Sequence, residues 1–169
     1  MRSIKSIVAL AAVAAVVGTG SKAIAADANG TASATIVTAL TVSNDTNLQF
    51  GSVAATTTAG TVVMGTASDT PTTYSNVVAQ AGTTTRGAIT VTGLAGATYS
   101  TTLPTSVTLS GSGTAAGNNM TVDGWASTAD GTIDAGGSDT VHVGATLQVG
   151  ASQVAGPYSG SYTVTFNYN

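Results

Sequence analysis

Apolar and polar residues alternate with a period of two along most of this chain, and the clearest case lies at its end. Between Tyr158 and Asn169 the aromatic and branched side chains occupy even positions, while Ser, Thr or Asn occupies most odd ones. Successive side chains of a strand point to opposite faces, so this pattern predicts a half-buried β-strand. Since no turn and partner segment follow it, we expect the strand to pair with an earlier segment or with another molecule.

The same alternation recurs upstream and is separated by turn-forming Gly, Asp and Asn residues. Residues 141–149 give the most regular run, and residues 32–42, 48–53, 87–92, 99–103 and 107–109 give further ones. Short half-buried strands at this spacing predict an all-β fold, a single immunoglobulin-like antiparallel β-sandwich. The sandwich is expected either to be complete in itself or to be completed by a donor strand from a neighbouring subunit.

The N-terminal segment has the pattern of a secretory signal peptide. Arg2 and Lys5 precede an apolar run from Ile7 to Val17, and Ala23-Ile-Ala25 fits a cleavage site. We therefore predict a signal peptide at 1–25, an N-terminal extension at 26–44 and a β-sandwich domain at 45–169. The protein is expected to be exported, first to the periplasm and then to the cell surface, without membrane insertion after cleavage.

Charge is scarce in the predicted mature chain and almost all of it is negative. Arg86 is the only basic residue after residue 25, and it stands against seven aspartates, which gives a net charge of about −6. A surface with one cation cannot neutralise a phosphate backbone, so nucleic acid is not expected as a partner. Few charges also mean little repulsion between copies of the chain.

The sequence offers few candidates for enzyme chemistry. The chain has no cysteine and no glutamate, and its one histidine, His142, lies between Val141 and Val143 and should point away from the apolar face. Asp130, Asp134 and Asp139 could gather calcium in a Gly-rich loop, but their spacing matches no known calcium loop and ordinary turn chemistry also explains them. We expect no enzyme, no cofactor and no metal site.

The N-terminal extension carries an alternating segment of its own, which could act as a donor strand. Its apolar and small side chains fall on even positions: Ala32, Ala34, Ile36, Thr38, Leu40 and Val42. If this segment belongs to its own sandwich, the protein is a monomer. If it inserts into a groove of another copy, main-chain hydrogen bonds would supply affinity and alternate side chains the register.

The chain end resembles the subunits of chaperone–usher pili. Those subunits typically have a penultimate aromatic residue and a glycine fourteenth from the end, and here Tyr168 and Gly156 occupy these positions. The Leu48-Gln-Phe-Gly-Ser-Val53 phrase is similar to archaic, spore-coat-U-like pilins. From about Ala32 onward the chain resembles still more closely a cysteine-free family of exported bacterial β proteins of unknown function.

The pilin resemblance implies a structural subunit of a surface filament, assembled by donor-strand exchange. Its partners would be other copies of itself, a periplasmic chaperone and an outer-membrane usher. One wall of the groove, held by the chaperone before assembly, would be Gly156, Tyr158, Tyr162, Val164, Phe166 and Tyr168.

A second hypothesis is a monomeric, secreted binding module for glycans or surface adhesion. Trp125 and the tyrosines would then serve as stacking platforms, although Trp125 follows an alternating strand, which favours core packing for it over ligand stacking.

Overall fold

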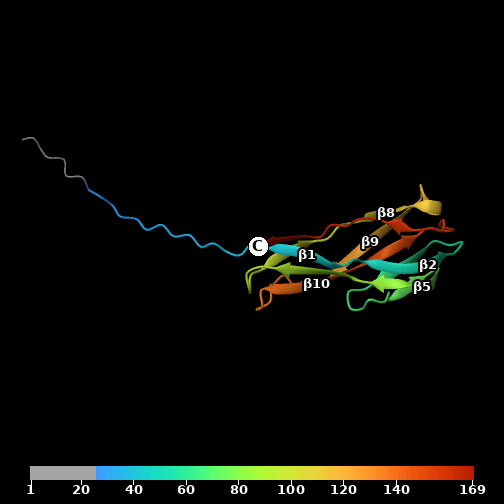
Figure 1. Ribbon diagram of the computed structural model, residues 1–169, viewed down its shortest axis with the longest axis horizontal. Coiled ribbons are helices and arrows are strands. Elements are labelled where there is room, and N and C mark those ends of the chain that lie inside the picture. The colour runs from blue at the N-terminus through green and yellow to red at the C-terminus, as the bar shows by residue number, and fades with distance from the viewer. Residues whose placement is uncertain (1–25) are drawn as a thin grey trace, which may run out of the picture. The chain divides into compact units, whose positions relative to one another are not determined.

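The computed structural model describes residues 26–169, so the predicted signal peptide at 1–25 lies outside the described residues. The chain divides into two units at Thr35. Residues 26–35 are exposed and form neither helix nor strand. Residues 36–169 form the other unit, and the folded domain within it contains twelve β-strands and one short 3₁₀ turn, with no α-helix among the described residues (Figure 1).

The larger sheet is organised around one long strand, β10 (Ser138–Val149). The first half of β10 pairs with β6 (Gly87–Thr92), and the second half pairs on the same edge with β3 (Gly60–Met64). On its other edge β10 pairs with β9 (Asn119–Ser127). The remaining members extend these edges antiparallel: β1 (Thr41–Thr46) on β6, β4 (Thr73–Ser75) on β3, β8 (Val107–Gly111) on β9, and β11 (Tyr158–Ser159) on β8.

The smaller pieces are two separate antiparallel strand pairs. Strand β2 (Gln49–Ala55) pairs with β5 (Val77–Thr85), and β12 (Thr165–Tyr168) pairs with β7 (Tyr99–Thr102). These two pairs are not hydrogen-bonded to each other. The sandwich therefore has one continuous sheet and one interrupted sheet.

The apolar side chains gather in two clusters. The first contains Tyr99, Ile133 and Phe166 together with buried residues of β6 and β10. The second contains Val62 and Val122 with the second half of β10, including Leu147. Buried and less buried residues alternate along β3, β6 and most of β10, as the period-two pattern requires. The all-β antiparallel sandwich predicted from the sequence is confirmed.

The domain begins earlier than the boundary expected at residue 45. Strand β1 starts at Thr41 and pairs with β6 through Val42 and Val91. Leu40, just before it, packs against the first cluster. Both residues were expected in the donor segment, but here they are part of the domain, because β6 offers a free edge and the first cluster offers an apolar surface.

Candidate functional site

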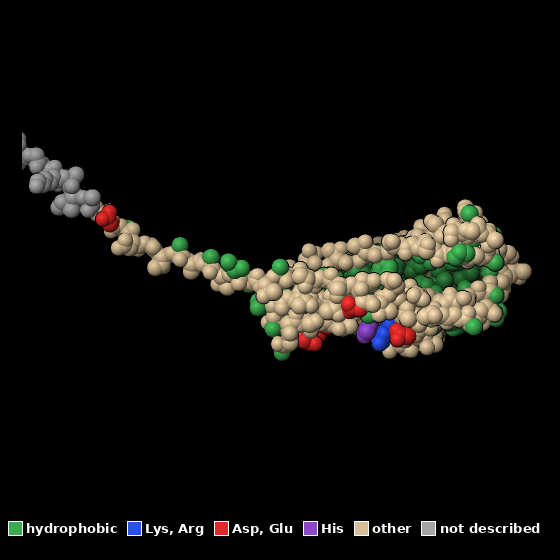
Figure 2. Space-filling view, in the orientation of Figure 1, with side chains coloured by type: hydrophobic (Ala, Val, Ile, Leu, Met, Phe, Trp, Pro, Cys, Tyr) green, Lys and Arg blue, Asp and Glu red, His purple; other side chains and the backbone are tan. Residues whose placement is uncertain are grey.

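A long apolar groove lies at the interruption of the smaller sheet. One wall is β2 with the residues before it, and the opposite wall is the C-terminal segment 153–164. The floor comes from the larger sheet and has a largely apolar lining: Val107, Leu109, Met120, Val122, Leu147 and Val149. The groove has a volume of about 1380 Å³, and Figure 2 shows its hydrophobic side chains exposed between two tan rims.

The two walls run antiparallel. The Ser152 N–H donates to the Thr56 carbonyl over 2.7 Å, which places the start of the C-terminal segment beside the end of β2. At the other end Tyr162 lies near the backbone of Leu48, just before β2 begins. The C-terminal segment then continues to Tyr168, where the chain end meets the start of the domain (Figure 1).

Both walls carry backbone that is not paired across the groove. Strand β2 has a partner on one edge only, β5. Residues 160–164 lie in no strand, and none of the loop backbone hydrogen bonds involves them. Free N–H and C=O groups along an apolar cleft are a template for another strand. The groove therefore has the two features that an inserted strand needs, namely apolar surface and unpaired edges.

The aromatic residues of the groove pack against each other. The ring centroids of Trp125 and Tyr162 are 4.8 Å apart, and Trp125 contacts both apolar clusters. The Trp125 Nε1 and the Tyr162 hydroxyl are both buried without a hydrogen-bond partner. Burial raises the pKa of Tyr162, and the nearby backbone of Leu48 offsets part of this effect. Trp125 is thus half-buried against Tyr162 and also lines the groove.

The residues predicted for the C-terminal wall fall into two groups, one that lines the groove and one that lies outside it. Gly156, Tyr158, Tyr162 and Val164 line the groove. Phe166 is instead buried in the first cluster against Tyr99, and Tyr168 lies at the end of the domain. The alternation of burial from Tyr158 to Tyr168 is as expected. However, the expected single strand is two short ones, because the chain pairs first with β8 and then with β7.

Gly156 occupies a position that only glycine fits. Its φ is +153°, and an added Cβ would lie 2.7 Å from the Ala115 Cβ and 2.9 Å from the Thr114 Oγ1. The close approach lets the C-terminal segment pass against the 3₁₀ turn Gly113–Ala115 before it enters β11. Gly156 thus positions the C-terminal wall of the groove.

The predicted donor residues lie in three settings. Ala32 and Ala34 are exposed in the N-terminal unit. Ile36 has 96% of its surface exposed, which is unusual for an isoleucine. Thr38 is exposed and its carbonyl accepts a hydrogen bond from Tyr168, whereas Leu40 and Val42 belong to the domain as described above.

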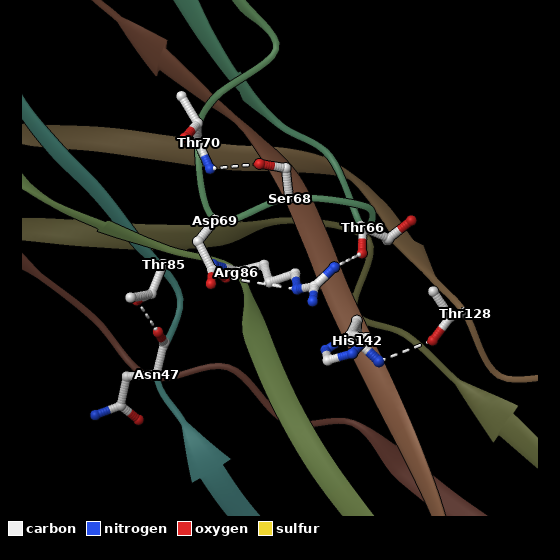
Figure 3. Close-up of polar contacts among 9 residues, drawn as sticks. All are labelled: Asn47, Thr66, Ser68, Asp69, Thr70, Thr85, Arg86, Thr128 and His142. Carbon is white, nitrogen blue, oxygen red and sulfur yellow. Dashed lines mark hydrogen bonds and ion pairs between the residues drawn. The ribbon is translucent and has the colours of Figure 1, made fainter.

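The charged and titratable groups make local structural contacts. Arg86 donates to the Thr66 carbonyl over 2.6 Å and forms an ion pair with Asp69, which ties the loop after β3 to the β5–β6 junction (Figure 3). His142 is half-buried on the face opposite Val141 and Val143, and its backbone N–H donates to Thr128 (Figure 3).

The aspartates of the Gly-rich loop are engaged in turns and in a tyrosine contact. Asp130 accepts from the Thr132 N–H, and Asp139 accepts from the Tyr99 hydroxyl. Burial and Asp139 together raise the pKa of Tyr99. Within residues 26–169 no group of three acidic or histidine side chains could hold a metal ion.

Sequence reasoning missed the other half of the groove. The alternation predicted that residues 48–53 and 107–109 form strands, but it gave no sign that Phe50, Val53 and Leu109 face an unfilled cleft. A half-buried strand face looks the same in sequence whether it is covered by its own chain or by another.

Comparisons with known proteins identify a family but no characterised relative. No curated protein and no solved structure matches the chain. In the described part of the chain, no helix has the length and apolarity needed to cross a membrane. Residues 40–168 match a family described as a domain of unknown function (DUF4402), and this match begins where the folded domain begins. The chain therefore belongs to the DUF4402 family.

Proposed function

We propose that this protein is a structural subunit of a bacterial surface filament, in which the N-terminal extension of one copy fills the apolar groove of the next. The observation that carries the proposal is the groove itself, with an apolar floor and an unpaired backbone edge on each side. A strand inserted there would join the β2–β5 pair to the C-terminal segment and make the smaller sheet continuous.

The extension has the length and pattern that the groove requires. Strand β2 has seven residues, which span roughly 23 Å at the usual rise of a strand. Residues 26–39 supply twice that number before the domain begins. Ala32, Ala34 and Ile36 would face the floor, and the intervening Ser and Thr residues would face outward. We omit Leu40 and Val42 from the donor segment because they already contact their own domain.

The termini give the assembly a direction. A donor strand antiparallel to residues 156–164 runs parallel to β2 and ends beside Thr56 and Ser152. The body of the donating copy then lies beyond that end. In each copy, the extension leaves the domain beside Tyr168, at the end of the domain opposite to Thr56 and Ser152. Copies joined in this way therefore add head to tail. An open groove would expose apolar surface during export, and a periplasmic chaperone would cover it.

The test uses the single tryptophan of the sequence, Trp125, as a reporter of the groove. A copy of residues 26–39 is appended after Asn169 through a short flexible linker, so that it can return along residues 156–164. We expect a soluble monomer with a higher melting temperature and a blue-shifted Trp125 emission, while the unmodified chain aggregates or polymerises. A matched control carries the same copy with Ile36→Asp in the appended segment only.

The proposal is wrong if the unmodified chain is already a stable monomer whose melting temperature and emission do not change when the segment is appended. A monomeric binding module with a complete sandwich would then be the better description.

A further inference from the structure

The contact between the C-terminal tyrosine and the N-terminal extension bears on which groove the extension can enter. The Tyr168 hydroxyl donates to the Thr38 carbonyl over 3.0 Å and accepts from the Leu94 N–H over 2.8 Å. Tyr168 is itself held by pairing with Tyr99 across β12 and β7. A Cβ at Gly93 would clash with the Tyr168 hydroxyl, so glycine there makes room for the contact.

The extension faces a choice of two grooves, its own and that of another copy. Its own groove begins close by, since Val42 and Val164 line it. To enter, the chain would have to reverse just before β1 and lie antiparallel to β2. Such a hairpin would produce a closed monomer that can accept no neighbour.

The anchored residues leave no room for that reversal. Thr38 is held by Tyr168, Leu40 packs on the first cluster, and Thr41 begins β1. Only Ala39 lies free between them, whereas the tightest common hairpin loops need two residues, preferably Asn-Gly or another pair that accepts positive φ. The segment Thr38-Ala-Leu-Thr41 contains no such residue.

We propose that Tyr168 acts as a latch that holds the base of the extension straight and so directs it to a second copy rather than into its own groove. This inference rests on the proposed function. Ile36 and Val37, which directly precede the latched Thr38, have 96% and 54% of their surfaces exposed. Such exposure is expected for a segment that is presented to another molecule.

The test compares full chains of residues 26–169, with the closed fraction measured at concentrations too low for copies to join and polymer measured at higher concentrations. Tyr168→Phe keeps the ring and removes the hydroxyl. A second variant keeps Tyr168 and inserts Asn-Gly between Thr38 and Ala39, which supplies a turn without altering the core. The control is Tyr99→Phe, which removes a tyrosine hydrogen bond on the paired strand but leaves the latch intact.

The readouts are Trp125 emission, the uptake of added peptide of residues 26–39, and polymer mass by light scattering. We expect Tyr168→Phe to raise the ratio of closed to open monomer roughly 2- to 10-fold, the range of one net hydrogen bond. The Asn-Gly insertion should raise it further, and both variants should form less polymer than Tyr99→Phe.

Two results would overturn the latch while leaving the proposed function standing. In the first, peptide binds all proteins but neither Tyr168→Phe nor the insertion changes the closed fraction. In the second, Tyr99→Phe raises that fraction as much as Tyr168→Phe does. If peptide binds none of the proteins, the proposed function fails and the latch fails with it.

Discussion

Ile36 and Leu40 lie four residues apart on the same predicted face of the extension, yet their surroundings in the structure are opposite. Ile36 has 96% of its surface exposed and Leu40 packs on the first cluster of its own domain. Introducing aspartate at each position therefore separates joining, the insertion of one copy's extension into the groove of the next, from folding of the domain. Ile36→Asp should prevent joining and spare the fold, and Leu40→Asp should damage the fold.

The magnitudes follow from burial. In a filled groove Ile36→Asp loses about 1.5–3 kcal/mol of apolar burial and adds several kcal/mol for an unpaired buried carboxylate. A total near 5 kcal/mol weakens joining by a factor of more than about 10³. In the subunit's own fold, the same change at an exposed site should stay within about 0.5 kcal/mol. Leu40→Asp should lower the free energy of unfolding by about 2–4 kcal/mol.

The assay measures folding and joining on separate samples. Urea unfolding of the donor-appended monomer, with the change made in its own extension, gives the free energy of unfolding. Polymer yield of the unappended chain gives joining. Thr35→Asp is the matched control, since it adds the same charge next to Ile36 on the opposite face and should permit joining. If the Ile36→Asp chain joins normally, the donor face assigned here is wrong, and a block by Thr35→Asp in that case would indicate the opposite face.

Three further changes test the site and its supports. Gly156→Ala should cost about 1–3 kcal/mol of unfolding free energy, because the new Cβ meets Ala115 and Thr114; Gly136→Ala, where an added Cβ meets nothing within 4 Å, should cost far less in the same urea titration. Phe166→Ala should cost about 3–5 kcal/mol, since Phe166 is buried against Tyr99, and a melting temperature within a degree of the wild type would contradict this. Because burial raises the pKa of Tyr162 and of Tyr99 in the folded state, their contribution to stability is fully present below about pH 10 and is lost as the pH rises above it. Melting temperatures between pH 8 and pH 11 should fall more steeply for the wild type than for Tyr162→Phe, and equal slopes would refute the assignment.

The sequence by itself determined the class of fold and much of the local structure. Period-two alternation needs only neighbouring residues to be visible, so it correctly predicted half-buried strands, the antiparallel sandwich and the alternating burial from Tyr158 to Tyr168. Gly156 is singled out only by the resemblance of the chain end to chaperone–usher pilins.

Only the tertiary structure decided which apolar faces are covered and by what. Alternation has the same form for Phe166, which is buried in its own core, for Val164, which lines a groove, and for Ile36, which is almost fully exposed. The start of the domain depended on the free edge of β6, and the course of the C-terminal segment depended on β8 and β7. These are long-range pairings between residues far apart in the chain, and the local pattern of one strand does not specify the partner that covers it.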